Sequence, residues 1–333
     1  MIRKVLVIRF SSIGDIVLTT PVVRCLKRQW DAEVHYLTKS SFRPVLEANP
    51  YIDRLHTIGK DVREALPLLK EEKYDLVVDL HRNLRSGQVK RALGRPGVSF
   101  PKLNLEKWLL VRFKWQRMPG LHIVDRYMAP LRPFGLAYDG EGLDYFIPPE
   151  GETDPFSLAG GAEEPYIAFS IGAAHATKRL PAGQLEAICR SLTCPVFLLG
   201  GPSDREMGEQ VAQNAGRHVY NLCGKLDINQ SASVVRQAAA VISHDTGLMH
   251  IAAAFRKPIV SVWGNTVPAF GMYPFYPDGM DAGIVEEVQG LPCRPCSKIG
   301  FGSCPKGHFQ CMTRQDTAQI AQNALSLFNS SCG

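Results

Sequence analysis

A regular alternation of short apolar runs with helical patterns restricts the fold of this chain more than any other feature. The first series of strand-like runs covers residues 5–10, 33–38, 54–58 and 76–80. Helical patterns follow the first run up to about Trp30 and the second run at 42–48. The second series covers residues 166–171, 196–199, 218–222, 240–243 and 259–263. Strands that alternate with helices form parallel sheets covered on both faces. The sequence therefore predicts an α/β protein with two doubly wound parallel-sheet domains.

The boundary between the two series lies in residues 148–165, which are rich in proline, glycine and acidic residues and show little periodicity. Such a composition is typical of a linker. We therefore predict a first domain at 1–150 and a second at 151–315, followed by a helical tail at 316–333. Parallel sheets bind ligands at the carboxyl ends of their strands. For two facing domains we expect the site in the cleft between them.

The charge of the chain is concentrated in residues 82–132, which contain twelve basic and two acidic residues. Trp108 and Trp115 lie among these charges. An excess of this kind predicts an anionic partner or an anionic surface. No stretch approaches the ~20 apolar residues of a membrane span. The apolar run before Arg9 is shorter than the roughly 7–15 residues of a signal-peptide core, so we expect a cytoplasmic protein.

The first motif is RFSSIGDIVLTTP, residues 9–21. A strand-like run ends at a loop that contains Ser11, Ser12 and Gly14, and Asp15 stands at the start of the next helix. Backbone N–H groups and the helix dipole at such a point favour an anion. They also favour an ionised Asp15, which is able to act as a general base. The alternative is that Asp15 or Ser12 only caps the helix.

The second motif is SHDTGLMHIAAA, residues 243–254. A strand again leads into a helix, whose start is marked by Asp245, Thr246 and Gly247, and His250 follows one turn later. The N–H groups of this helix start would hold a phosphate or sugar hydroxyls. Asp245 would accept hydrogen bonds from hydroxyls, and His250 would donate one to a phosphate. The alternative is a capped helix with a buried histidine.

Two further motifs also follow predicted strands. In SIGAAHATKRLP, residues 170–181, Lys178 offers a point charge suited to a diphosphate, or belongs to a solvated basic pair. In LLGGPSDREMGE, residues 198–209, Asp204 is placed to accept ribose hydroxyls or to cap a helix. Neither a GxGxxG nor a GxxxxGK[ST] pattern is present, which argues against an NAD-dependent dehydrogenase and against a P-loop protein.

The four motifs, in this order and spacing, resemble the ADP-heptose:lipopolysaccharide heptosyltransferase family, glycosyltransferase family 9, over nearly the whole chain. The resemblance implies a GT-B fold of two Rossmann-like domains facing a cleft, with the acceptor on the N-terminal domain and the nucleotide sugar on the C-terminal domain. It implies inverting transfer of heptose from ADP-heptose to the lipopolysaccharide inner core, with no metal or other cofactor needed for catalysis. It also suggests that the tail at 316–333 packs back onto the first domain.

The resemblance also assigns roles to individual residues. Asp15 matches the family's catalytic base, and Lys178 matches the lysine at the donor diphosphate. We expect the donor to be bound by Thr177, Lys178, Asp204, Asp245, Thr246, Gly247 and His250. We expect the acceptor or its phosphates to be bound by Ser11, Ser12, Gly14, Arg85, Lys102 and Arg126.

The sequence departs from the family pattern around the donor lysine. It has Lys178-Arg179-Leu180-Pro181 where the family often has K-x-W-P. It has Ala173 and Ala174 where the family has threonine hydroxyls, so that Thr177 is the one hydroxyl near Lys178. The alternative of a family relative that uses another nucleotide sugar therefore stays open.

The basic segment 82–132 allows two classes of partner. In a heptosyltransferase, it would meet the phosphates of a lipid-linked acceptor or the cytoplasmic surface of the inner membrane. The protein would then be peripheral to that membrane and would need no nucleic acid. The alternative is a nucleic-acid-binding protein, which would leave Asp15, Asp245 and His250 without a role.

Four cysteines gather near the C-terminus, namely Cys293, Cys296, Cys304 and Cys311, and His308 lies among them. Four thiolates, or three thiolates and one imidazole, suit tetrahedral zinc. The second pair lacks the CxxC spacing of the first. A structural zinc site, a disulfide and plain thiols all remain compatible with this segment.

Overall fold

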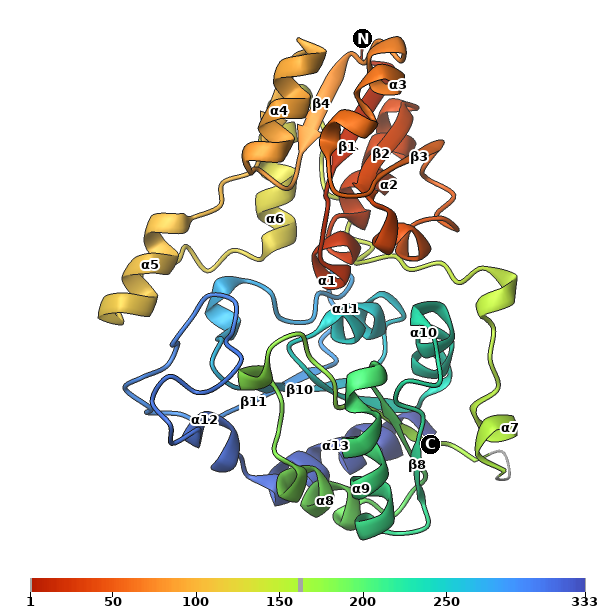
Figure 1. The fold of residues 1–333 in the computed structure, drawn as a ribbon, viewed down its shortest axis with the longest axis vertical. Coiled ribbons are helices and arrows are strands. Elements are labelled where there is room, and N and C mark those ends of the chain that lie inside the picture. Colours follow the sequence, from red (N-terminus) through yellow and green to blue (C-terminus); the bar gives the residue numbers. More distant parts are fainter. Residues whose placement is uncertain (1, 161–163, 333) are drawn as a thin grey trace. The chain divides into compact units, whose positions relative to one another are not determined.

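The computed structural model describes residues 2–160 and 164–332, which form two compact units (Figure 1). The first unit comprises the chain up to Lys102 together with Leu121–Pro148. The second comprises Leu103–Gly120 together with the chain from Pro149 onward. Each unit contains one all-parallel sheet, which confirms the predicted fold class. Within the described residues, no helix is both long and apolar enough to cross a membrane.

The first unit is built on a five-stranded sheet of order β3-β2-β1-β4-β5. Its strands are β1 (Lys4–Ile8), β2 (Glu33–Lys39), β3 (Arg54–Ile58), β4 (Leu76–Asp79) and β5 (Gly97–Ser99). Its α-helices are α1 (Ile13–Val17), α2 (Thr20–Trp30), α3 (Leu66–Glu71), α4 (Leu84–Leu93) and α6 (Ile123–Met128). Its 3-10 helices are η1 (Ser40–Val45), η2 (Val62–Glu64) and η3 (Ala129–Phe134). The central strands β1 and β4 are buried on both faces, as expected for a parallel sheet.

The second unit is built on a six-stranded sheet of order β11-β10-β9-β6-β7-β8. Its strands are β6 (Ile167–Ser170), β7 (Val196–Leu199), β8 (Val219–Asn221), β9 (Ala240–His244), β10 (Ile259–Trp263) and β11 (Gly283–Glu287). Its α-helices are α5 (Asn104–Phe113), α7 (Pro155–Ala159), α8 (Ala182–Ser191), α9 (Arg205–Ala215), α10 (Ile228–Gln237), α11 (Gly247–Ala254), α12 (Gln310–Thr313) and α13 (Thr317–Cys332). Its 3-10 helices are η4 (Pro149–Gly151), η5 (Ala176–Lys178), η6 (Pro202–Asp204) and η7 (Pro268–Phe270).

The C-terminal helix α13 packs within the second unit. It contacts α8 and the strands β9 and β10, and it buries Ile320, Ala321 and Ala324. These contacts account for its apolar face. A return of the tail onto the first domain stays a prediction.

Several elements differ from those predicted by periodicity. The helix expected from about residue 15 to Trp30 is divided into α1 and α2, with Pro21 in the first turn of α2. The helix expected at 42–48 is instead η1, which contains Pro44. Proline lacks the N–H group that an α-helix interior requires. The sequence did not predict β11, nor the elements α4, β5 and α5 of the basic segment.

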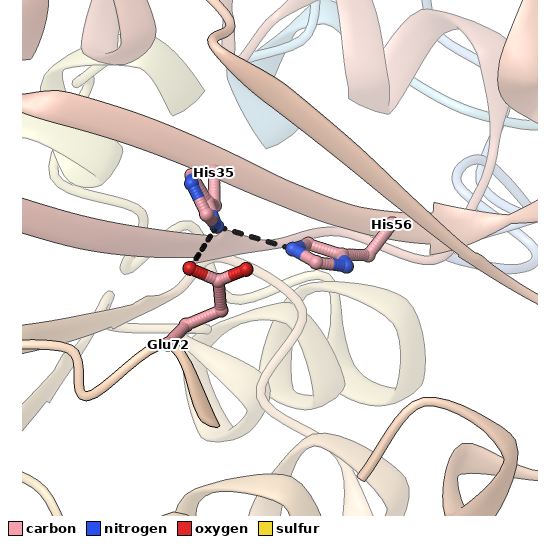
Figure 2. Close-up of side chains that lie close together, drawn as sticks. All are labelled: His35, His56 and Glu72. Atoms are coloured by element: carbon pink, nitrogen blue, oxygen red, sulfur yellow. Dashed lines mark hydrogen bonds and ion pairs between the residues drawn. The ribbon is translucent and has the colours of Figure 1, made fainter. Parts of the chain in front are cut away.

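A polar network lies between β2, β3 and the chain after α3 (Figure 2). His35 on β2 and His56 on β3 are both buried, and His56 Nε2 is 3.1 Å from His35 Nδ1. The hydroxyl of Tyr74 is 2.9 Å from His35 Nδ1. On the other side of the His35 ring, Nε2 is 2.9 Å from a carboxylate oxygen of Glu33. Because Glu33 only accepts, His35 carries its proton on Nε2 and presents a lone pair on Nδ1.

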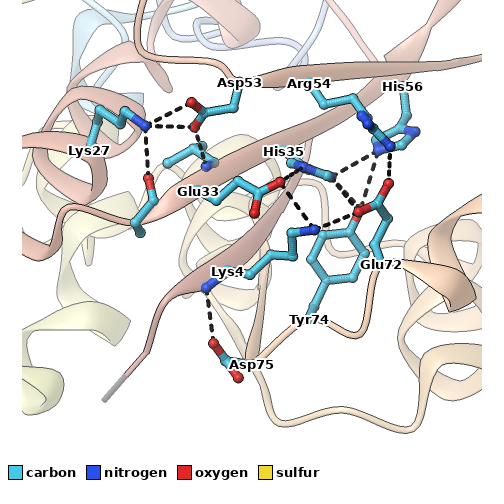
Figure 3. A network of polar contacts seen from close by, with 12 residues as sticks. Lys4, Lys27, Glu33, His35, Asp53, Arg54, His56, Glu72, Tyr74 and Asp75 are labelled. Carbon is cyan, nitrogen blue, oxygen red and sulfur yellow. Dashed lines mark hydrogen bonds and ion pairs between the residues drawn. The ribbon is translucent and has the colours of Figure 1, made fainter.

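The carboxylate of Glu72 joins this network to two ion pairs (Figure 3). Glu72 lies 4.0 Å from His35 Nδ1, and its two oxygens pair with Lys4 Nζ at 2.6 Å and with Arg54. Burial lowers the pKa of His35. Burial, reinforced by His35, lowers the pKa of His56 to about 4. Both rings are therefore neutral at pH 7 and act as hydrogen-bonding groups between adjacent strands.

The buried histidines predict a loss of stability in mild acid. Histidines of the unfolded chain titrate near pH 6.5, so between pH 6.5 and 4 the unfolded state binds protons that folded His56 does not. The free energy of unfolding should be highest above pH 6.5 and fall through this window, by roughly 1.4 kcal/mol per unit of pKa difference. Chemical denaturation between pH 4.5 and 8 measures this fall. His56→Gln should make it shallower, while the two curves run parallel above pH 7. An unchanged fall in the variant would show that His56 is not responsible.

Candidate active site

Asp15 lies at the carboxyl end of β1, in the first turn of the five-residue helix α1. Its Oδ2 accepts hydrogen bonds from Ser12 Oγ at 2.9 Å and from Ser12 N at 3.3 Å. Its Oδ1 is 2.6 Å from Arg9 Nη2. The side chain remains 23% exposed. The capping interaction is therefore present, and the ion pair with Arg9 is added to it.

Arg9 was not singled out by sequence analysis. In the structure its side chain contacts Asp15, Ser11, Leu80 and Tyr127. It is buried. Its Nε donates to Ser11 O at 2.7 Å, and its Nη1 donates to Leu80 O at 2.6 Å and to Tyr127 Oη at 3.1 Å. Burial alone would raise the pKa of Asp15, but the Arg9 guanidinium and the Ser12 hydrogen bonds hold that pKa below its usual value. The result is an ionised carboxylate in a fixed orientation.

His81 is a second titratable group at this edge of the first sheet, directly after β4. Its ring lies edge-on to Phe10, with centroids 5.0 Å apart. Burial, reinforced by Arg9, lowers the pKa of His81 to about 4, so the ring is neutral at pH 7. Its Nδ1 is buried and has no hydrogen-bond partner among the described residues.

The expected acceptor-binding residues of the first unit differ in accessibility. Gly14 is buried within α1. Arg85 is exposed on α4, and Lys102 is half-buried after β5. Arg126 on α6 is 1% exposed, and burial lowers the pKa of its guanidinium. Of these three basic side chains, Arg85 is the one that the structure presents openly to solvent.

In the second unit, Lys178 and Asp245 form an ion pair. Lys178 ends η5, which follows β6, and Asp245 directly follows β9. Lys178 Nζ is 2.6 Å from Asp245 Oδ2, and Thr266 Oγ1 donates to the same oxygen at 2.8 Å. Thr266 lies after β10, so this contact joins the carboxyl ends of three adjacent strands. Both charged side chains are more than four-fifths buried, and the pair is therefore well ordered.

Next to this ion pair lies the amino end of α11. Thr246 is its N-cap residue, Gly247 is its first residue, and His250 is buried one turn later. Within the described part of the chain, Thr246 Oγ1 and both side-chain polar atoms of Asn265 are buried and have no hydrogen-bond partner. Buried polar groups are normally paired. These atoms, together with the first N–H groups of α11, offer hydrogen bonds to a ligand.

Asp204 lies deeper in the second unit than expected for an exposed hydroxyl acceptor. It is 6% exposed. Its Oδ2 accepts from Gly201 N at 2.9 Å, and its Oδ1 is 2.9 Å from Arg179 Nη1. A Cβ atom at Gly172 would lie 2.4 Å from Asp204 Oδ2, so the loop after β6 requires glycine there. Through Arg179, Asp204 is tied to the loop that carries Lys178.

The cysteine segment is hydrogen-bonded to the loop that carries Thr177 and Lys178. Thr177 Oγ1 accepts a hydrogen bond from Phe301 N at 2.8 Å, and Thr177 N donates to Phe301 O at 3.2 Å. Cys296 N donates to Asn265 O at 3.1 Å. The Arg294 guanidinium donates to Gly264 O at 2.5 Å and to Thr266 O at 2.9 Å. The hydroxyl of Thr177 is thus used within the protein, and Arg294 supports the backbone of Thr266.

All four clustered cysteines are free thiols in the structure. Cys296 Sγ donates to Cys293 O at 3.1 Å, and Cys293 Sγ is 3.8 Å from His308 Nε2. Burial, followed by the neighbouring thiols, raises the pKa of Cys296 and of Cys311 to about 11. The thiols therefore lie close enough to influence one another.

Among the described residues, one group of side chains has the spacing of metal ligands. It consists of His35, His56 and Glu72 in the first unit. Both oxygens of Glu72 are already paired with Lys4 and Arg54. A cation there would be repelled by two positive charges. This group is better explained as the ion-pair and hydrogen-bond network of the first sheet.

Comparison with known proteins shows the family to which the chain belongs. Residues 63–297 match the model of glycosyltransferase family 9 (heptosyltransferase). Lipopolysaccharide heptosyltransferase 2 of Escherichia coli is 26% identical, over 97% of this chain and 99% of that protein. A family 9 glycosyl transferase of Veillonella parvula superposes with a TM-score of 0.77 at 23% identity, and covers 98% of each chain.

A second solved structure, described as E. coli ADP-heptose lps heptosyltransferase II, has a TM-score of 0.73 at 20% identity. The match covers 99% of this chain and all of the other. Two units, each built on an all-parallel α/β sheet, are the GT-B architecture, which these neighbours share. The chain therefore belongs to glycosyltransferase family 9, the heptosyltransferase family, and is a glycosyltransferase with the GT-B fold.

Proposed function

We propose that this enzyme transfers heptose from ADP-heptose to the inner core of lipopolysaccharide, with inversion and without a catalytic metal. Family membership supports the reaction class, and a structural neighbour is described as an ADP-heptose enzyme. The observation that carries the donor site is the convergence of Lys178, Asp245 and Thr266 at the carboxyl ends of three strands. Unpaired buried polar groups lie in the same place, at Thr246 and Asn265.

Asp15 is the proposed general base. A sugar hydroxyl is a weak nucleophile, and removal of its proton during attack raises its reactivity. The low pKa of Asp15 makes the carboxylate a weak base in the resting enzyme. This suits a reaction in which the hydroxyl becomes acidic only as its oxygen bonds to the anomeric carbon. Arg9 is a positioning residue that holds Asp15 ionised and correctly oriented.

Lys178 and the amino end of α11 are the proposed stabilisers of the leaving group. Cleavage of the bond between the anomeric carbon and the phosphate oxygen leaves negative charge on the diphosphate of ADP. Preorganised donors aimed at such charge lower the barrier without reorganisation. Asp245 holds Lys178 in place. His250 and Asp204 are expected to bind the phosphate and the ribose, respectively.

The reaction balances as a single displacement. The acceptor oxygen forms a bond to the anomeric carbon as the bond to ADP breaks, and the acceptor proton passes to Asp15. Attack opposite the leaving group inverts the anomeric centre. No covalent enzyme intermediate is required.

The acceptor is proposed to be a phosphorylated, lipid-linked saccharide at the cytoplasmic face of the inner membrane. Of the three basic residues expected to bind its phosphates, Arg85 is exposed and Lys102 is half-buried, so both are accessible, whereas Arg126 is buried. Ser11 and Ser12 adjoin Asp15 and would orient the attacking hydroxyl. Membership of a glycosyltransferase family favours this function over nucleic-acid binding, which would leave Asp15, Asp245 and His250 without a role. Because Ala173 and Ala174 replace hydroxyl residues, a different nucleotide sugar is the alternative donor.

Calorimetric titration in the absence of divalent metal tests the donor. The wild-type protein should bind ADP-heptose in preference to UDP-GlcNAc and GDP-mannose. Lys178→Met should weaken donor binding about 10- to 100-fold, which is the usual worth of hydrogen bonds to a charged group. Lys225→Met, an exposed lysine of the same unit, is the matched control. Preference for another nucleotide sugar would keep the reaction class and replace the donor.

Replacement of Asp15 tests the proposed base. Asp15→Asn should lower kcat by on the order of 10²–10⁴-fold, the usual contribution of general base catalysis. The Kd for ADP-heptose should stay within about twofold, because Asp15 is not part of the donor site. Asp31→Asn, at an exposed aspartate after α2, controls for the loss of a carboxylate. Near wild-type turnover in a folded Asp15→Asn protein would remove Asp15 as the base.

We also propose that Cys293, Cys296, Cys304 and Cys311 hold one structural metal ion, with zinc as the expected metal. The proximity of these groups supports the proposal: Cys293 Sγ is 3.8 Å from His308 Nε2, and burial, followed by the neighbouring thiols, raises the pKa of Cys296 and of Cys311. Among the described residues, the four sulfurs are not close enough together to ligate one metal ion. Metal binding would therefore draw the loop together, with His308 as an alternative ligand beside Cys293.

Metal analysis of the purified protein distinguishes the alternatives for the cysteine segment. We expect close to one zinc per chain, released by a chelator, and a lower melting temperature after release. Because this segment braces Thr177 and Thr266, donor affinity should fall as well. Cys194→Ser, at a buried cysteine outside the segment, should retain the metal. A metal-free protein with four titratable thiols would leave plain thiols, and two fewer thiols would indicate a disulfide.

A further inference from the structure

The helix α5 (Figure 1) exposes an unusually large number of apolar side chains for a segment so rich in charge. Four large apolar side chains lie exposed on or just after this helix. Their exposed fractions are 64% for Leu105, 53% for Trp108, 47% for Phe113 and 58% for Trp115. We call this set the α5 surface. It contains two of the chain's four tryptophans.

The three aromatic rings of the α5 surface form one continuous patch. The ring centroids of Trp108 and Phe113 are 5.2 Å apart in an edge-on arrangement. The centroids of Phe113 and Trp115 are 5.4 Å apart. Residues 105 and 108 are three apart and share one side of the helix. The patch therefore acts as a single apolar unit rather than as scattered surface residues.

The opposite face of α5 already has its partner. Leu110 and Met118 are buried together with Phe270 of η7. Lys114 fixes the end of the helix, since its Nζ donates to Cys293 O at 3.2 Å and to Pro295 O at 2.7 Å. The inner face thus explains why the helix forms and where it is anchored. It does not explain the aromatic outer face.

Basic residues surround the α5 surface. Residues 103–120 contain Lys107, Arg112, Lys114 and Arg117 against the single acidic residue Glu106. Arg112 and Arg117 are exposed. An apolar patch bordered by positive charge matches a surface that is apolar just below a layer of negative charge. A bilayer with anionic lipid headgroups has this structure.

We propose that the α5 surface docks the enzyme on an anionic phospholipid bilayer. Tryptophan is enriched at the membrane–water interface, and cationic side chains near an anionic leaflet strengthen binding. The ten-residue helix is too short to span a bilayer of about 30 Å, so it would lie in the plane of the interface. This docking would bring the enzyme to the membrane where the proposed lipid-linked acceptor lies. The proposal rests on the proposed function only for this biological purpose.

A second copy of the chain fits the α5 surface less well. A two-fold symmetric contact places the same patch on both partners, which would bring two sets of positive charges together. Stable interfaces bury about 1,200–2,000 Å² in total, whereas the α5 surface consists of four side chains. Charge complementarity therefore favours the bilayer.

Vesicle binding of the full-length protein tests the proposal. The protein should sediment with vesicles of phosphatidylglycerol and phosphatidylethanolamine, and much less with phosphatidylcholine alone. Trp108→Ser combined with Trp115→Ser should weaken the partition by on the order of tenfold or more. Arg112→Gln and Arg117→Gln should each weaken it roughly fivefold. Leu68→Ser, at an exposed leucine of α3, is the control and should bind as the wild type does.

Tryptophan fluorescence gives a second readout of the same contact. Lipids brominated near the headgroup should quench Trp108 and Trp115, while the buried Trp263 keeps its emission. Calorimetric binding of ADP to the double tryptophan variant should equal that of the wild type, so loss of docking is separable from loss of the donor site. Vesicle binding that survives both tryptophan substitutions would overturn the proposal. So would an absence of vesicle binding together with a dimer that these substitutions dissociate.

Discussion

The parallel arrangement of the strands is the constraint on which the rest of this protein depends. The middle residues of the central strands carry no charge, because both faces of these strands are buried. The ionisable groups of both candidate sites therefore stand just after the strands, where the backbone leaves the core. Arg9 and Asp15 follow β1, Asp245 follows β9, and Thr266 follows β10. Because parallel neighbours end at the same edge, residues far apart in sequence meet there without any long-range design of the loops.

At this edge, each unit pairs one carboxylate with one cationic side chain, but the two ion pairs differ in burial. In the first unit the cation is the buried member: Arg9 has all its contacts inside the fold, and Asp15 keeps 23% of its surface exposed. In the second unit both members are similarly buried, and Asp245 has Thr266 as an additional partner. The first pair is therefore suited to present a carboxylate, and the second to orient an ammonium group.

The sequence predicted the positions of the motifs because their local chemistry is sufficient. A strand followed by glycine, hydroxyl and acidic residues must turn and begin a helix, and this holds at Asp15, Asp245 and Asp204. The partners of these residues were not predictable in the same way. Thr266 is 21 residues from Asp245 in the chain, and Arg294 reaches Gly264 from 30 residues away. Such contacts arise from the order of strands in the sheet, which periodicity does not reveal. Thr177 shows the same limit. The sequence predicted that its hydroxyl would bind a ligand, whereas in the structure this hydroxyl accepts a hydrogen bond from Phe301 N.

The basic segment shows most clearly what composition leaves undecided. Its net charge predicts an anionic partner, but charge counts treat Arg85 and Arg126 alike, although one is exposed and the other is 1% exposed. The segment is also divided between the two compact units. Its helix α4 offers cations without exposed aromatic rings, whereas α5 offers rings bordered by cations. Phosphates need only the first kind of surface, while a bilayer interface rewards the second. One run of positive charge thus supplies two chemically different surfaces, which only the fold separates.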